Sequence, residues 1–119
     1  MYLGQQVLLE LHGCDPHKLR DPHYLEREMR LAAEAMGATV VTSTFHHFSP
    51  LGVSGVVVIQ ESHLTIHTWP EYDYAAADIF TCGEIDMRAG TVYLAKALAA
   101  KNFTEKTLPR GLLHSPIES

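Results

Sequence analysis

Residues that could do chemistry are concentrated in one segment of thirty positions, from Ser54 to Gly83. The segment holds two serines, two histidines, several acids, one tryptophan and one cysteine. Within it, Ser62 directly follows Glu61 at the junction of two predicted strands, where a tight turn could strain the peptide bond between them. Such strain lowers the barrier to rearrangement. The segment therefore predicts a reactive serine at position 62.

The expected rearrangement begins when the Ser62 hydroxyl attacks the carbonyl of Glu61 and turns the amide into an ester. Elimination then leaves dehydroalanine and finally a pyruvoyl group, so the chain is cut. A base must remove the Ser62 α-proton, and His67 is a candidate because histidine titrates near neutral pH. Ser54 could donate a hydrogen bond to the oxyanion of the cyclic intermediate.

Four sequence blocks follow one another in order: STFH at Ser43–His46, GVSGVVVI at Gly52–Ile59, ESHLTIHTWPE at Glu61–Glu71 and FTCG at Phe80–Gly83. In these blocks the chain resembles the prokaryotic S-adenosylmethionine decarboxylase family, the pyruvoyl enzymes of spermidine synthesis. The resemblance covers most of the chain. It implies cleavage between Glu61 and Ser62, which would give a β chain of residues 1–61 and an α chain of residues 62–119.

The resemblance also implies roles for individual residues. Ser54 and His67 would serve processing, and Cys82 would protonate the substrate α-carbon after carbon dioxide leaves. Phe48 would stack on adenine, and Glu71 would hold the ribose hydroxyls. The pyruvoyl carbonyl would form a Schiff base with the substrate amine and act as the electron sink, so no external cofactor is expected. Similar enzymes assemble as dimers of αβ units, so we expect a homodimer.

One position departs from the family pattern. Where the family usually reads EYGYA, this chain has EYDYA, which places Asp73 close to Glu71. Asp73 suits a surface turn, but an added acid could also bind the ammonium or guanidinium group of a substrate. A pyruvoyl-dependent arginine or ornithine decarboxylase is therefore the first alternative function. A non-catalytic subunit or binding domain is the second.

A metal site is not predicted. His63 and His67 lie four residues apart, and His46 and His47 are the other histidines that could join them. On a strand, a step of four residues separates two rings by about 13 Å, which is too far for one ion unless the chain bends.

The strands and helices that must position these residues are predicted from the spacing of apolar residues and from residues typical of helix caps and turns. Strands are predicted over residues 7–11, 38–48, 53–60, 63–69 and 75–82, the fourth with one polar and one core face. One helix is predicted from Asp21 as its cap to Gly37 as its stop, and Asp86 can cap a second. The segment from Lys101 has no clear pattern. The expected fold is an α+β two-layer sandwich, with a mostly antiparallel sheet and two helices packed on one face.

Length, net charge and composition limit the classes of partner that the protein could bind. A chain of 119 residues suits one domain, expected to span residues 1–119. The formal net charge of −5 and the lack of a Lys/Arg cluster argue against nucleic acid. No apolar run resembles a membrane span or signal peptide, so a cytoplasmic protein with a small-molecule substrate is expected. Two cysteines are too few for a disulfide framework.

Overall fold

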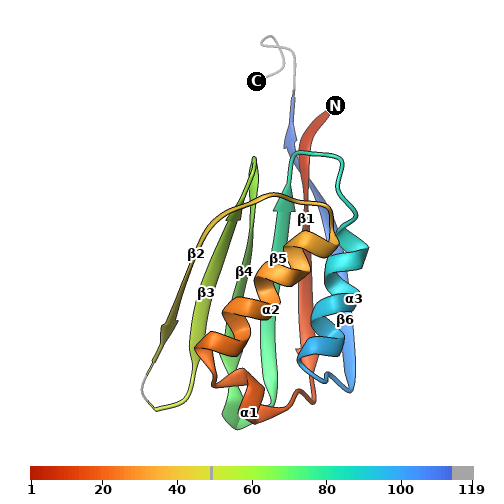
Figure 1. The fold of residues 1–119 in the computed structure, drawn as a ribbon. Coiled ribbons are helices and arrows are strands. Elements are labelled where there is room, and N and C mark those ends of the chain that lie inside the picture. Colours follow the sequence, from red (N-terminus) through yellow and green to blue (C-terminus); the bar gives the residue numbers. More distant parts are fainter. Residues whose placement is uncertain (49, 114–119) are drawn as a thin grey trace.

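The computed structural model describes residues 1–48 and 50–113, which form one antiparallel sheet with helices on one face (Figure 1). Within these residues the sheet has six strands in the order β2-β3-β4-β5-β1-β6. The elements in chain order are β1 (Tyr2–His12), α1 (Pro16–Leu19), α2 (Pro22–Ala35), β2 (Val40–His47), β3 (Val53–Ile59), β4 (Ser62–Trp69), η1 (Pro70–Tyr72), β5 (Tyr74–Thr81), α3 (Met87–Ala97) and β6 (Asn102–Leu112). The predicted α+β sandwich is confirmed.

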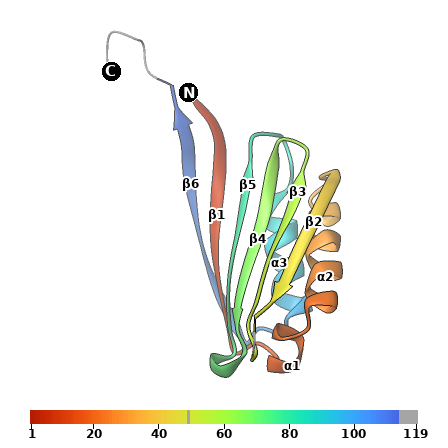
Figure 2. The same ribbon diagram turned by 90° about the vertical axis from the view of Figure 1, so that its left-hand side faces the viewer.

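The core lies between the sheet and the helices α2 and α3, which share one side of the sheet (Figure 2). On β4, Leu64, Ile66 and Thr68 are buried under the helices, and the residues between them face the open side. On β3, Val57 and Ile59 are buried, whereas Val58 on the open face is 37% exposed. The apolar VVVI run is therefore covered on one face only within a single chain.

Local capping explains where the helices begin. The Asp21 carboxylate accepts hydrogen bonds from the backbone N–H groups of His23 and Tyr24 at the start of α2. Asp86 caps α3 in the same way by accepting from the backbone N–H of Ala89 at 3.1 Å. Gly37, with φ of +87°, follows the C-terminal end of α2. Both predicted helix starts are confirmed.

Three elements differ from the prediction. The residues after Cys14, for which no helix was predicted, form the one-turn helix α1. Strand β1 begins at Tyr2 instead of Val7. Strand β6 was not predicted, and it pairs with β1 from His12↔Asn102 to Tyr2↔Leu112. Figure 2 shows that the ribbon of β1 and β6 curves away from the rest of the sheet toward the N-terminus.

Among the described residues, no helix combines the length and apolar character that a membrane span requires.

Candidate active site

The Glu61–Ser62 peptide bond lies in the tight turn between β3 and β4. Ile59 pairs with Ser62, so Gln60 and Glu61 form a two-residue connection. Glu61 has φ of +66°, in the left-handed region, where a side chain costs about 1–2 kcal/mol. The Ser62 hydroxyl donates a hydrogen bond to the carbonyl oxygen of Glu61, in the same peptide bond. The hydroxyl is thus held at the bond that the sequence predicts to break.

Cys82 lies beside Ser62 because β4 and β5 are neighbouring strands. Its backbone N–H donates to the Ser62 Oγ at 3.0 Å, and its thiol is exposed. A cavity of about 400 Å³ borders Cys82, with Tyr2 and Gly4 among its other lining residues. A Cβ on Gly4 would lie 3.3 Å from the Cys82 Sγ and 2.5 Å from the Thr81 carbonyl oxygen, so glycine leaves room for the thiol.

A second cluster forms further along β4. Ser54 and His67 are cross-strand partners, and the Ser54 Oγ lies 2.7 Å from the His67 Nδ1. Both residues line a cavity of about 310 Å³ that Phe48 and Glu71 also line. The structure therefore brings together four of the residues that the sequence singled out.

The two clusters are separate within one chain. Ser62 and His67 are five residues apart on β4, and a rise of about 3.3 Å per residue puts them roughly 17 Å apart. His67 is therefore too far from Ser62 of its own chain to remove the α-proton. Either another base acts in processing, or His67 acts on a second copy of the chain.

Asp73 has a left-handed backbone conformation. It ends the 3₁₀ turn η1 with φ of +53°, a conformation that glycine adopts freely and aspartate tolerates. Its carbonyl accepts a hydrogen bond from the Cys14 backbone N–H at 2.9 Å. Among the described residues, those that line the Phe48 cavity include Glu71 but not Asp73. The turn therefore accepts aspartate in place of the glycine usual in the family.

The two cysteines have different surroundings. Burial, with a smaller contribution from the Asp73 carboxylate, raises the pKa of Cys14 to about 11, so this thiol stays neutral at physiological pH. Cys82 is exposed. Of the two cysteines, only Cys82 is accessible.

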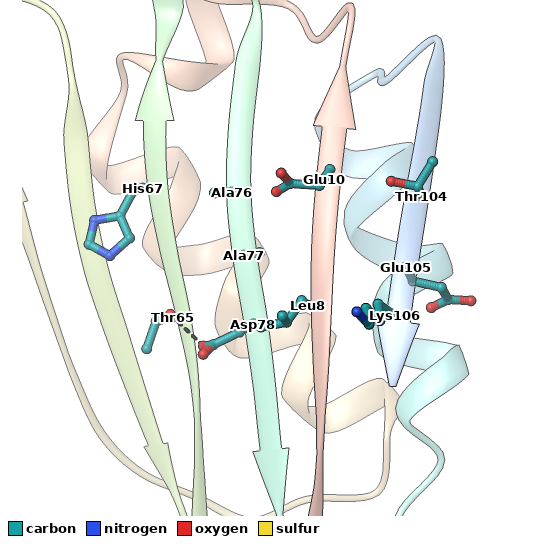
Figure 3. Close-up of a pocket in the computed structure, with 10 residues that line it drawn as sticks. All are labelled: Leu8, Glu10, Thr65, His67, Ala76, Ala77, Asp78, Thr104, Glu105 and Lys106. Carbon is teal, nitrogen blue, oxygen red and sulfur yellow. Dashed lines mark hydrogen bonds between the residues drawn. The ribbon is translucent and has the colours of Figure 1, made fainter. Parts of the chain in front are cut away.

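The open face holds a third cavity, of about 630 Å³ (Figure 3). Asp78 lies in it at the centre of the sheet, where it accepts hydrogen bonds from the Thr65 hydroxyl and from the Gln6 Nε2. Sequence reasoning missed Asp78, although a single acid in the otherwise apolar run AAADIF was a signal. The cavity is lined by Leu8, Glu10, Thr65, His67, Ala76, Ala77, Asp78, Thr104, Glu105 and Lys106.

Within residues 1–48 and 50–113, no group of three or more His, Cys, Asp or Glu side chains is arranged to hold a metal ion.

Comparison with known proteins identifies the family of the chain. A family model described as S-adenosylmethionine decarboxylase matches residues 5–111. The chain belongs to this family. A relative in Thermotoga petrophila named S-adenosylmethionine decarboxylase proenzyme is 58% identical over 100 residues, which cover 83% of this chain and 77% of the relative. The family resemblance seen in the four sequence blocks is confirmed.

Two further matches extend over nearly the whole chain. An S-adenosylmethionine decarboxylase proenzyme of Caldanaerobacter subterraneus subsp. tengcongensis is 50% identical over 117 residues, or 98% of this chain and 94% of the relative. The crystal structure of the adenosylmethionine decarboxylase from Aquifex aeolicus aligns with a TM-score of 0.85 at 29% identity. That alignment covers 95% of this chain and 94% of the other. This chain thus shares its fold with a solved adenosylmethionine decarboxylase.

Proposed function

We propose that the chain is the proenzyme of a pyruvoyl-dependent S-adenosylmethionine decarboxylase that cleaves itself between Glu61 and Ser62. The observation that carries the proposal is the Ser62 hydroxyl held against the carbonyl of a left-handed Glu61. The names of the relatives, which are decarboxylase proenzymes, support the same conclusion.

Self-cleavage would proceed from this contact. The Ser62 Oγ attacks the Glu61 carbonyl carbon, the bond from that carbon to the Ser62 nitrogen breaks, and the nitrogen becomes a free amine. Removal of the Ser62 α-proton then expels the Glu61 carboxylate from the serine Cβ. The resulting enamine takes up water and releases ammonia, which leaves a ketone at position 62. The Cys82 backbone N–H, which donates to the Ser62 Oγ, would orient that oxygen before attack.

The mature site would use the surrounding side chains. The pyruvoyl carbonyl, once formed, supplies the electron-withdrawing group for loss of carbon dioxide, so an external cofactor has no role in the proposal. The exposed Cys82 thiol is the proposed proton donor to the substrate α-carbon. Phe48, a residue that is 51% exposed, would stack on adenine, and Glu71 in the same cavity would accept hydrogen bonds from the ribose hydroxyls.

The proposal includes a homodimer formed through the open face of the sheet. Ser62 and Cys82 lie roughly 17 Å from the Ser54–His67 pair of the same chain, by the rise of β4. Apolar side chains lie partly exposed on the open face, including Leu8 at 39%, Val58 at 37% and Trp69 at 40%. A twofold axis near the middle of β4 would bring the Ser54–His67 pair of one copy to Ser62 of the other. Each site would then contain residues of both copies.

The central experiment is the intact mass of the purified protein. We expect two fragments, one ending at Glu61 and one beginning at a residue 62 that has lost its nitrogen and reacts with hydroxylamine. The Ser62→Ala variant should fold and stay uncleaved. A native chain that stays in one piece, resists hydroxylamine and still decarboxylates substrate would overturn the proposal, whereas a native chain that neither cleaves nor turns over substrate would indicate the non-catalytic alternative.

Substrate identity needs a separate assay. The cleaved protein should release carbon dioxide from S-adenosylmethionine and not from arginine or ornithine. Asp73→Gly is expected to leave that rate unchanged, because the turn at Asp73 suits glycine. Carbon dioxide release from only a basic amino acid, lost in Asp73→Gly, would establish the first alternative. A cytoplasmic location stays a prediction from composition.

A further inference from the structure

The ring of His63, the second residue after the proposed cleavage point, contacts a side chain of the neighbouring strand β5. His63 pairs with Phe80 on β5, and the two rings stack with centroids 5.8 Å apart and planes inclined by 19°. The Arg110 guanidinium of β6 also lies over the Phe80 ring, 5.7 Å from its centroid. Two distant parts of the sheet thus meet on one aromatic ring.

A series of polar side-chain contacts also connects His63 with Arg110. The Asp78 Oδ1 lies 3.7 Å from the His63 Nε2. The Asp78 Oδ2 accepts a hydrogen bond from the Gln6 Nε2 at 2.6 Å, and Arg110 donates to the Gln6 Oε1. We call this set the His63 clamp: His63, Asp78, Phe80, Gln6 and Arg110. It spans the four strands β4, β5, β1 and β6.

The proposed cleavage removes contacts that fix the position of residue 62. Before cleavage, Ser62 is held by its peptide bond to Glu61 and by its hydroxyl, which donates to the Glu61 carbonyl and accepts from the Cys82 backbone N–H. Self-cleavage as proposed above removes both, and the amide bond to His63 is the covalent link that remains. A misplacement of about 1 Å in a reacting group can cost about a hundredfold in rate. The placement of residue 63 therefore governs the placement of the ketone.

We propose that His63 is a positioning residue, whose ring, stacked on Phe80 and facing Asp78, holds the start of the α chain in its reactive position after cleavage. The inference depends on the proposed self-cleavage. It assigns a role to His63 and to the side chains of β1 and β6 that reach it. His63 itself does not transfer a proton in this account.

The test compares three variants of the full chain. His63→Ala removes the ring, His63→Phe keeps an aromatic ring that can stack on Phe80, and His23→Ala removes an exposed histidine at the start of α2, on the helix layer. Ketone content is counted with hydroxylamine, so that kcat is expressed per ketone and separated from the extent of cleavage. The rate of hydroxylamine reaction and the thermal midpoint are measured on the same samples.

For His63→Ala we expect kcat per ketone to fall by about tenfold to a hundredfold, with KM changed by less than about threefold. The ketone should react faster with hydroxylamine, because the chain start is less restrained. His63→Phe should recover most of the loss in kcat, and His23→Ala should match the native protein. Equal kcat per ketone in His63→Ala and the native protein would overturn the inference. A fall in kcat that His63→Phe does not reduce, accompanied by a lower thermal midpoint, would also overturn it by showing a role in folding.

If His63→Ala does not cleave, a substitution at another residue of the His63 clamp tests the inference instead. Arg110→Met removes the hydrogen bond to Gln6 and the cation over Phe80, far along the chain from the cleaved bond. It should still cleave and show the same pattern with a loss of about threefold or more. No change in its kcat per ketone or in its hydroxylamine reaction would then count against the clamp. If the native protein itself fails to cleave, the proposed function fails first, so the two failures are distinguishable.

Discussion

Glu61 holds a backbone conformation that glycine adopts freely, at the bond proposed to break. Glu61→Gly should release about 1–2 kcal/mol of strain in the precursor. If that strain is relieved on the way to the ester, cleavage should slow by roughly fivefold to thirtyfold. The measurement is a time course of fragment formation on denaturing gels, started from freshly refolded chain.

Two control variants isolate the backbone effect at Glu61. Ala99 also has a positive φ, of +55°, at the end of α3, so Ala99→Gly should stabilise the fold without changing the cleavage rate. Glu61→Gln keeps the strained backbone and removes the charge, so it should cleave at nearly the native rate. Cleavage of Glu61→Gly at the native rate would show that the turn does not contribute to the reaction.

Cys82 allows processing and turnover to be separated. Its contact with Ser62 is made by the backbone N–H, which Cys82→Ala retains. We therefore expect this variant to cleave normally, while decarboxylation falls by about 10²-fold or more because the proton donor is missing. Fragment analysis and carbon dioxide release on the same sample test both parts. Loss of cleavage together with turnover would assign the thiol to processing instead.

Among the elements, α2 and α3 are joined by a titratable contact. The Tyr93 hydroxyl of α3 donates to the Glu28 Oε2 of α2 at 2.6 Å. This hydrogen bond, with burial and the Glu28 charge, raises the pKa of Tyr93 from 10.0 to about 12. Because the folded pKa is above the unfolded one, the stabilisation is complete below pH 10 and is lost as pH rises toward 12.

Tyr93→Phe tests this contact. The variant should be less stable than the native protein at pH 8, and the difference should shrink as pH rises from 10 to 12. Urea unfolding at a series of pH values gives the free energies. A difference that stays constant across that range would mean that the hydroxyl does not titrate with unfolding. Tyr93 lies away from both clusters of the site, so cleavage should be unaffected.

Elements whose signals are local could be predicted from the sequence. The caps at Asp21 and Asp86 act within three residues, and the alternation of β4 follows from the two faces of one strand. Strand β6 could not be found in this way. Only Phe103 and Leu108 of its eleven residues are even partly buried, so it has no alternating core pattern, and its pairing with β1 depends on residues about a hundred positions away.

The site was predictable only in part, for the same reason. The family resemblance singled out Phe48, Ser54, His67 and Glu71 one by one, and all four line one cavity. Asp78 meets Gln6, 72 positions away, and that contact follows from the strand order, which the sequence does not reveal. The distance between Ser62 and His67 follows from strand spacing, but the sequence alone does not say from which copy of the chain the candidate base comes.

At the scale of the whole molecule, the separation of the two clusters leads to a complementation test. Ser62→Ala and His67→Ala chains should each stay uncleaved when produced alone. In a mixed dimer, one site combines Ser62 of the His67→Ala chain with His67 of the Ser62→Ala chain. Coexpression should therefore yield cleavage of the His67→Ala chain alone, which its mass identifies. Absence of cleavage in verified mixed dimers would contradict a shared site.

The strand order has a further consequence for the cleaved protein. After the proposed cleavage, strand β1 would belong to the N-terminal fragment but lie between β5 and β6 of the C-terminal fragment. The two pieces are therefore interleaved, and neither can leave without dismantling the sheet. Separation of the fragments and unfolding become a single event, which makes the thermal midpoint of the mature protein rise with its concentration. The sheet would form while the precursor is one chain, and after cleavage the two separated fragments would have to associate in order to refold.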